Sequence, residues 1–217
     1  MAITNNVSII TDSLVMCFDA TNSRSYTSGN TWTDLTNNST ANVTGFTLAG
    51  SGGTSHFSFN SVRAQITGVS SWQYGTGPRT VTAWAYPTSI GGWMQVIGWG
   101  SGTDTASGLA IDPSGKWATF RHNVAGYYSN TNAVVNAWSH VTITHSSSGL
   151  EIYINGVLDY SNGQTINVTQ SSAYIGASFD DREYWQGRIA QVLFYNKKLT
   201  AAEIKQNYNA TKRRYGL

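Results

Sequence analysis

The 217-residue sequence contains few charged residues, little proline and a single cysteine. Only 11% of the residues are charged while 12% are aromatic, which argues against both a helical bundle and a disordered chain. No run of about 18 apolar residues occurs, so the sequence predicts no membrane insertion. With Cys17 alone, no intramolecular disulfide can form, and we expect Cys17 to be a buried core thiol.

The positive charge is concentrated at the end of the chain. The formal net charge is +2, and residues 197–217 hold six Lys or Arg against one acid, Glu203. A dense, uniform basic surface is absent, so we expect no nucleic-acid partner. The basic end is either the solvated face of a helix or a docking surface for an acidic partner. Residues 1–6 contain no basic residue and no apolar region, which predicts no secretory signal.

Short runs rich in Val, Ile, Thr, Tyr and Trp recur along the chain, and they are typical of half-buried β-strands. Asp112-Pro113-Ser114-Gly115 and Asn155-Gly156 are turn signals that indicate hairpins. Residues 25–55, rich in Thr, Asn, Ser and Gly, are interpreted as long loops inside one domain. The predicted strands are Leu14–Phe18, Ala64–Ile66, Thr80–Ala85, Gln95–Trp99, Leu109–Ile111, Trp117–Arg121, His140–Thr144, Leu150–Ile154, Ala173–Ile175 and Arg188–Tyr195.

One helix is predicted, at about residues 200–213. Thr200 and Glu203 have the spacing of a capping box, and Ile204 and Tyr208 form an apolar stripe at i, i+4. Many short strands and one terminal helix favour an all-β jelly-roll β-sandwich. We therefore expect an N-terminal arm at residues 1–13 and one jelly-roll domain at residues 14–217 that includes the helix.

Three segments resemble the laminin-G-like family of the concanavalin A-like lectin/glucanase superfamily. They are the strand Thr80–Pro87, the hairpin in which Trp138–Thr144 is followed by Leu150–Gly156, and the segment Trp185–Thr200. The resemblance implies the sandwich fold. It also implies that Trp84, Trp138 and Trp185 fill its interior, although a fold by itself does not define a function.

The two ends of the chain carry a finer resemblance. Leu14–Ala20 and Glu203–Ala210 are similar to segments of laminin-G-like proteins of tailed bacteriophages. This implies a virion protein without enzymatic activity, either a capsid decoration or a tail or fibre appendage, whose partners are other virion proteins. Two alternatives stay open: an adhesin dedicated to host-surface polysaccharide, and a glycoside hydrolase. Assembly into a homo-oligomer is also left open.

Hydrolysis of glycosides needs two carboxylates about 5–10 Å apart. Glu151 lies on a predicted strand, but the same-face positions Tyr153 and Asn155 offer no second acid. Glu203 is used by the helix cap, and Glu183 falls in a predicted loop. The sequence therefore predicts no enzymatic activity.

Binding is the better-motivated activity, because exposed aromatic rings stack on the apolar faces of sugars and also mark protein interfaces. The candidate aromatic residues in polar loops are Trp93, Tyr127, Tyr128 and Tyr184. Asp180 and Asp181 lie in a predicted rim loop and are either calcium ligands or turn formers. No other cofactor is expected.

Overall fold

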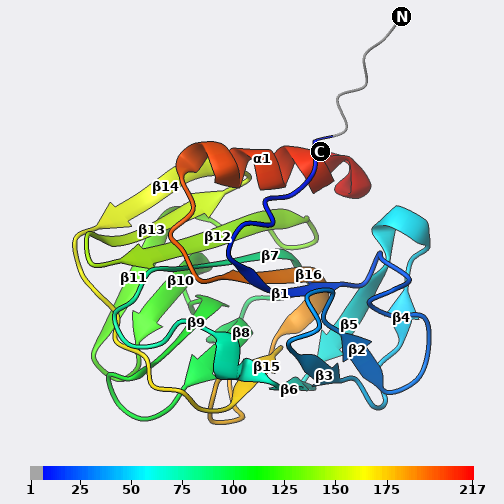
Figure 1. Cartoon of the computed structure of the whole chain (residues 1–217), viewed down its shortest axis with the longest axis horizontal. Coiled ribbons are helices and arrows are strands. Elements are labelled where there is room, and N and C mark those ends of the chain that lie inside the picture. The colour runs from blue at the N-terminus through cyan, green and yellow to red at the C-terminus, as the bar shows by residue number, and fades with distance from the viewer. Residues whose placement is uncertain (1–6) are drawn as a thin grey trace, which may run out of the picture.

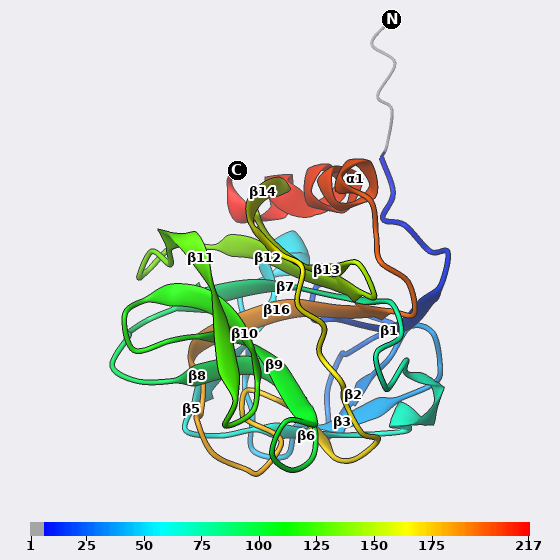
Figure 2. The ribbon, with the colours of Figure 1, turned by 90° about the vertical axis from the view of Figure 1, so that its left-hand side faces the viewer.

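A computed structural model describes residues 7–217, which form two antiparallel β-sheets packed face to face, with one α-helix on the outside (Figures 1 and 2). The jelly-roll sandwich with a short C-terminal helix is therefore confirmed. In sheet order, sheet A holds β14 (Val157–Asn162), β13 (Gly149–Ile154), β12 (Ser139–Ser146), β7 (Arg79–Pro87), β16 (Gln186–Tyr195), β5 (His56–Asn60) and β4 (Leu48–Ala49), and β1 (Leu14–Asp19) pairs with β16. Sheet B holds β11 (Ala125–Asn132), β10 (Lys116–Arg121), β9 (Ala106–Ile111), β8 (Met94–Gly100), β15 (Ala173–Ile175), β6 (Ala64–Thr67), β3 (Thr40–Asn42) and β2 (Thr31–Thr33).

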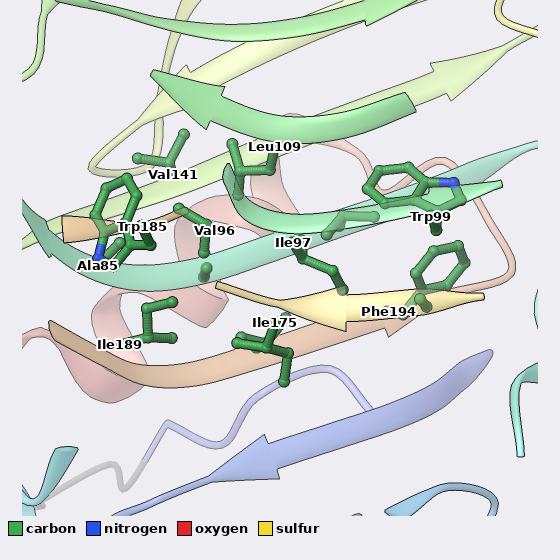
Figure 3. Packing of buried hydrophobic residues seen from close by; sticks show 14 of the residues in the cluster. Ala85, Val96, Ile97, Trp99, Leu109, Val141, Ile175, Trp185, Ile189 and Phe194 are labelled. Carbon is green, nitrogen blue, oxygen red and sulfur yellow. The ribbon is translucent and has the colours of Figure 1, made fainter. Parts of the chain in front are cut away.

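The main core lies between the two sheets. Side chains alternate along a strand, so the inward positions of β7, such as Val81 and Ala83, are apolar while Thr80 and Thr82 point outward. Figure 3 shows the branched and aromatic side chains of both sheets meeting in this layer. Trp185 stacks on Trp117 there, with ring centroids 6.1 Å apart, which confirms its predicted place in the core.

The helix α1 (Ala201–Thr211) covers the outer face of sheet A (Figure 1). The predicted capping box is present, because Thr200 Oγ1 accepts from Glu203 N–H and the Glu203 carboxylate accepts from Thr200 N–H. Ile204 is fully buried with Leu193 and Tyr195 on this face. The short 3₁₀ helix η3 (Lys212–Tyr215) continues α1 toward the C-terminus.

Two tryptophans depart from the prediction. Trp84 is buried, but it lies under the helix beside Tyr208 and Ala190 rather than between the sheets. The register of β7 and β12 explains this, because His140 pairs with Trp84 and both residues point to the helix side. Trp138 precedes β12 and is only partly buried. Both indoles therefore hold the helix in place rather than filling the interior.

The start of the described chain packs against the helix. Ile10 N–H donates to Asn207 Oδ1 at 2.8 Å, and Tyr195 Oη donates to the Ile10 carbonyl at 3.0 Å. Ile9 packs on the same apolar cluster as Cys17, whose predicted burial is confirmed. Burial also raises the pKa of the Cys17 thiol well above its usual range. Residues 1–6 of the predicted arm lie outside the described residues.

Several strands were not predicted. Residues 25–55, interpreted as loops, contain β2, β3 and β4, each only two or three residues long. The edge strands β11 and β14 and the short β5 were also missed. The predicted hairpins do occur, since Asp112–Gly115 joins β9 to β10 and Asn155-Gly156 joins β13 to β14 with positive φ at both turn residues. Sheet pairing, not local composition, makes the polar segments into strands.

Candidate aromatic cleft on sheet B

A cleft of about 310 Å³ lies where the turn between β10 and β11 meets two other loops. Figure 2 shows β8, β9 and β10 in the layer that faces away from α1. Clefts of this size that combine aromatic and polar walls are the usual form of small-ligand sites. The residues that line the cleft of this protein are Trp93, Phe120, Arg121, His122, Asn123, Val124, Ala125, Gly126 and Glu183.

The aromatic wall follows from strand alternation. Trp117 points into the core, so Phe120 takes the outer face of β10, and Gly126 lies opposite it on β11. Tyr128 shares that face, and its ring extends over Gly126, where an added Cβ would lie 2.0 Å from the Tyr128 hydroxyl. Trp93 packs against Phe120 edge-on at 5.7 Å and against Tyr128 at 6.2 Å. The partly exposed indole of Trp93 is therefore held in place by two neighbouring rings.

A polar turn forms the second wall. The Val124 N–H donates to the Arg121 carbonyl at 2.9 Å, and Asn123 takes a positive φ of 58°, which asparagine tolerates well. Arg121 binds the Asp104 carboxylate through two hydrogen bonds of 2.6 and 2.7 Å. These bonds lower the pKa of the Asp104 carboxyl, so the pair is doubly ionised and electrically neutral. The turn therefore presents the exposed Asn123 amide beside the neutral Arg121–Asp104 ion pair.

Glu183, in the connection between β15 and β16, forms a third wall of the cleft. Its backbone carbonyl accepts from Gln95 N–H at 2.8 Å, and its carboxylate accepts from the Gln95 side-chain amide. Gln95 is fully buried, so this contact fixes the position of the carboxylate. Glu183 also has a positive φ of 52°, an uncommon conformation for a residue with a long side chain. Such strain persists only where the surrounding structure enforces it, and it is concentrated at functional sites.

The structure unites two of the four predicted aromatic residues. Trp93 lines the cleft, and Tyr128, which is 36% exposed and not itself a lining residue, packs against Trp93. The prediction for Tyr127 is wrong, because its ring is only 6% exposed and lies in the main core: it pairs with Thr119, on the inner face of β10. Tyr184 is partly buried outside the cleft lining, and its hydroxyl donates to the Asp181 carboxylate at 2.8 Å.

The two aspartates proposed as calcium ligands are engaged by arginines. Asp180 forms an ion pair with Arg182 at 2.7 Å, and Asp181 forms one with Arg63. The hydrogen bond from Arg63 lowers the pKa of the Asp181 carboxyl. Within residues 7–217, no group of three or more His, Cys, Asp or Glu side chains is placed to hold a metal ion. The two aspartates therefore serve as the acidic partners of ion pairs in the rim loop.

The other site residues were missed by sequence reasoning. Phe120, His122 and Asn123 line the cleft, yet none was a candidate, and Glu183 was considered only as a catalytic acid and was set aside. The turn could have been found, because Asn123 and Gly126 follow a strand pattern as hairpin residues do. Glu183 could not, since only the pairing of β8 and β15 brings its loop beside Gln95. Glu151, the nearest candidate for a catalytic acid in the rejected hydrolase alternative, lies outside the cleft lining and is ion-paired with Lys198 at 2.8 Å.

The sandwich and its open cleft define a lectin-like β-sandwich protein. The family described as the concanavalin A-like lectin/glucanases superfamily, Laminin_G_3, matches residues 51–205. The chain therefore belongs to this superfamily, as its sequence motifs implied. Among curated proteins, no sequence matches the chain.

Solved structures of low sequence identity share the fold. A Trypanosoma rangeli sialidase superposes with a TM-score of 0.72 at 18% identity, covering 95% of this chain and 34% of that chain. The receptor binding domain of botulinum neurotoxin D gives 0.68 at 16%, covering 91% and 52%. The binding domain of Paraclostridial Mosquitocidal Protein 1 gives 0.70 at 16%, also covering 91% and 52%. The chain thus spans about a third of the length of the sialidases.

The expected role as a structural protein of a bacteriophage virion is contradicted by these comparisons. The similar structures described above are sialidases and binding domains of toxins, and none of these is named as a capsid or tail protein. The similarity at the two ends of the chain misled the prediction because those segments serve the fold: Leu14–Asp19 is β1, and Glu203–Ala210 lies in α1. Along residues 7–217, no helix is both long and apolar enough to cross a membrane.

Proposed function

We propose that this protein binds carbohydrate in the aromatic cleft on sheet B and does not cleave it. The main support is the position of the Trp93 indole. This ring is partly exposed at the edge of a cleft with polar walls, and Phe120 and Tyr128 hold it in place. A fixed aromatic ring offers stacking area at little entropic cost. The toxin domains of the same fold, named for receptor binding and for binding, agree with such a role.

The polar groups around Trp93 suit a sugar. A pyranose ring has an apolar face of C–H groups and a rim of hydroxyls that both donate and accept hydrogen bonds. Asn123 supplies a donor and an acceptor, and the Glu183 carboxylate supplies acceptors only. A sugar stacked on Trp93 would thus find polar partners on two sides, which gives orientation as well as affinity.

The number of carboxyl groups in the cleft supports binding without hydrolysis. Glycosidases with a conventional mechanism use two carboxyl groups that flank the scissile bond. Among the described residues that line the cleft, Glu183 is the single carboxylate. Asp104 stands behind Arg121 and is occupied by two hydrogen bonds from it. A single carboxylate can accept a hydrogen bond from a sugar hydroxyl. It cannot both protonate the leaving group and assist attack on the sugar carbon, which glycosidases divide between two carboxyl groups.

A pair of tryptophan variants tests the proposal. Trp93→Ala removes the stacking surface, and we expect binding to immobilised oligosaccharides to fall at least tenfold, since an aromatic anchor contributes about 2 kcal/mol or more. Trp138→Ala is the matched control, because Trp138 is also partly buried among aromatic rings but lies on the outer face of sheet A. Binding that survives Trp93→Ala, or is lost only in the control, would refute the proposal.

A further inference from the structure

The ionised groups around the cleft are paired, with one exception. Arg121 is bound to Asp104, and in the β15–β16 connection Asp180 is bound to Arg182 and Asp181 to Arg63. Glu183 accepts from the neutral amide of Gln95. Within residues 7–217, no Lys or Arg lies at ion-pair distance from the Glu183 carboxylate. The cleft therefore holds one uncompensated negative charge.

We propose that Glu183 makes the cleft selective for neutral glycans and excludes sugars that carry a carboxylate. This inference rests on the proposed carbohydrate binding and adds the chemical class of the ligand. A carboxylate accepts hydrogen bonds from sugar hydroxyls, and bonds to a charged acceptor are stronger than neutral ones. The same charge repels a uronic or sialic carboxylate that is bound in the cleft.

The geometry makes Glu183 a fixed charge rather than a mobile one. Its main chain is held by the Gln95 N–H at 2.8 Å, and its side chain by the Gln95 amide. An acidic sugar stacked on Trp93 could not displace the carboxylate without breaking a contact to a fully buried residue. Arg121 also lines the cleft, but its guanidinium is bound to the Asp104 carboxylate through Nε and Nη2, so its positive charge is already balanced. Specificity here depends on a repulsive group as well as on attractive ones.

The experiment uses matched glycans and a charge-removing variant. The probes are printed neutral hexose oligomers and their C6-oxidised forms, in which a carboxylate replaces the hydroxymethyl group. We expect the wild-type protein to bind neutral oligomers at least tenfold more tightly than the oxidised ones, with the ratio falling as salt is added. In Glu183→Gln, whose side-chain oxygen can still accept from Gln95, the ratio should fall to about threefold or less.

Asp12→Asn is the control for net charge, because the Asp12 side chain belongs to the N-terminal arm, is 76% exposed, pairs with Lys197 and does not line the cleft. It should leave the ratio unchanged. Oligomers that bind through Trp93 but with equal or better affinity in oxidised form would overturn the inference and leave the proposed function standing. An unchanged ratio in Glu183→Gln would also overturn it. No binding of any oligomer would overturn the proposed function and this inference with it.

Discussion

At the scale of single residues, two histidines of β12 are buried and neutral. His140 shares a hydrogen bond between its Nε2 and Thr82 Oγ1 at 3.0 Å, and His145 Nε2 accepts from Ile166 N–H at 2.7 Å. Burial lowers the pKa of His140 to about 3 and that of His145 to about 4. Between about pH 4 and 6.5, both imidazoles are therefore neutral in the folded protein and charged in the unfolded chain.

This difference makes stability depend on pH. In the unfolded chain a histidine binds its proton near pH 6.5, whereas these two do so in the folded protein only near pH 3 and 4. The unfolded state thus binds more protons between those limits, and the free energy of unfolding should fall as the pH is lowered from 6.5 toward 4. Above pH 6.5 the two residues should make no further contribution. His56 is shifted in the same direction by burial and adds to the trend.

Urea unfolding at pH 5.0 to 7.5 checks this expectation. The carboxyl groups with lowered pKa, such as Glu203, act below this window. Between pH 6.5 and 5, His145→Gln should reduce the pH slope by the equivalent of about one proton, because one shifted group is removed. A slope in the variant equal to that of the wild-type protein would contradict the assignment of His145.

At the scale of elements, the strands fall into two groups. Strands with apolar inward positions were predicted from composition, as β7 and β16 illustrate. The polar edge strand β11 was missed, because its residues Ala125–Asn132 become a strand only by pairing with β10. The same reason limits the prediction of the site. Trp93 was predicted because it is an aromatic residue in a loop. The place of Glu183 in the cleft could not be predicted, because it depends on contacts between segments far apart in the sequence.

The β10–β11 hairpin gives a prediction about the aromatic wall. Gly126→Ala would place a methyl group 2.0 Å from the Tyr128 hydroxyl, so the Tyr128 ring must move away from Gly126. Because Tyr128 supports Trp93, we expect glycan affinity to fall about three- to tenfold while the melting temperature changes little. Calorimetric titration and thermal unfolding of the variant measure the two effects.

Gly163→Ala is the control for that variant, because an added Cβ at position 163 meets nothing within 4 Å. It should change neither the affinity nor the melting temperature. Full wild-type affinity in Gly126→Ala would mean that Tyr128 has no part in holding Trp93. A large loss of stability would mean instead that the hairpin cannot adjust.

At the scale of the whole molecule, the two outer faces are used differently. Sheet A is covered by α1 and by the start of the described chain, which bury Trp84, Ile204 and Tyr208. Sheet B lies on the other side (Figure 2). The residues of the aromatic cleft belong to this sheet and its loops. The basic C-terminal end, a possible docking surface by sequence, is partly neutralised: Lys197, Lys198 and Arg214 all bind acids within the fold. The proposed binding site therefore lies on the sheet that α1 does not cover.

Binding of a neutral glycan in the Trp93 cleft can be followed by a ¹H–¹⁵N NMR titration of the whole chain with the best-binding printed oligomer. We expect saturable shifts of the Trp93 indole N–H and of the amides of residues 121–126 and Glu183, with those of α1 unmoved. Shifts confined to α1 or to the outer face of sheet A, with the Trp93 signal unchanged at saturation, would contradict it.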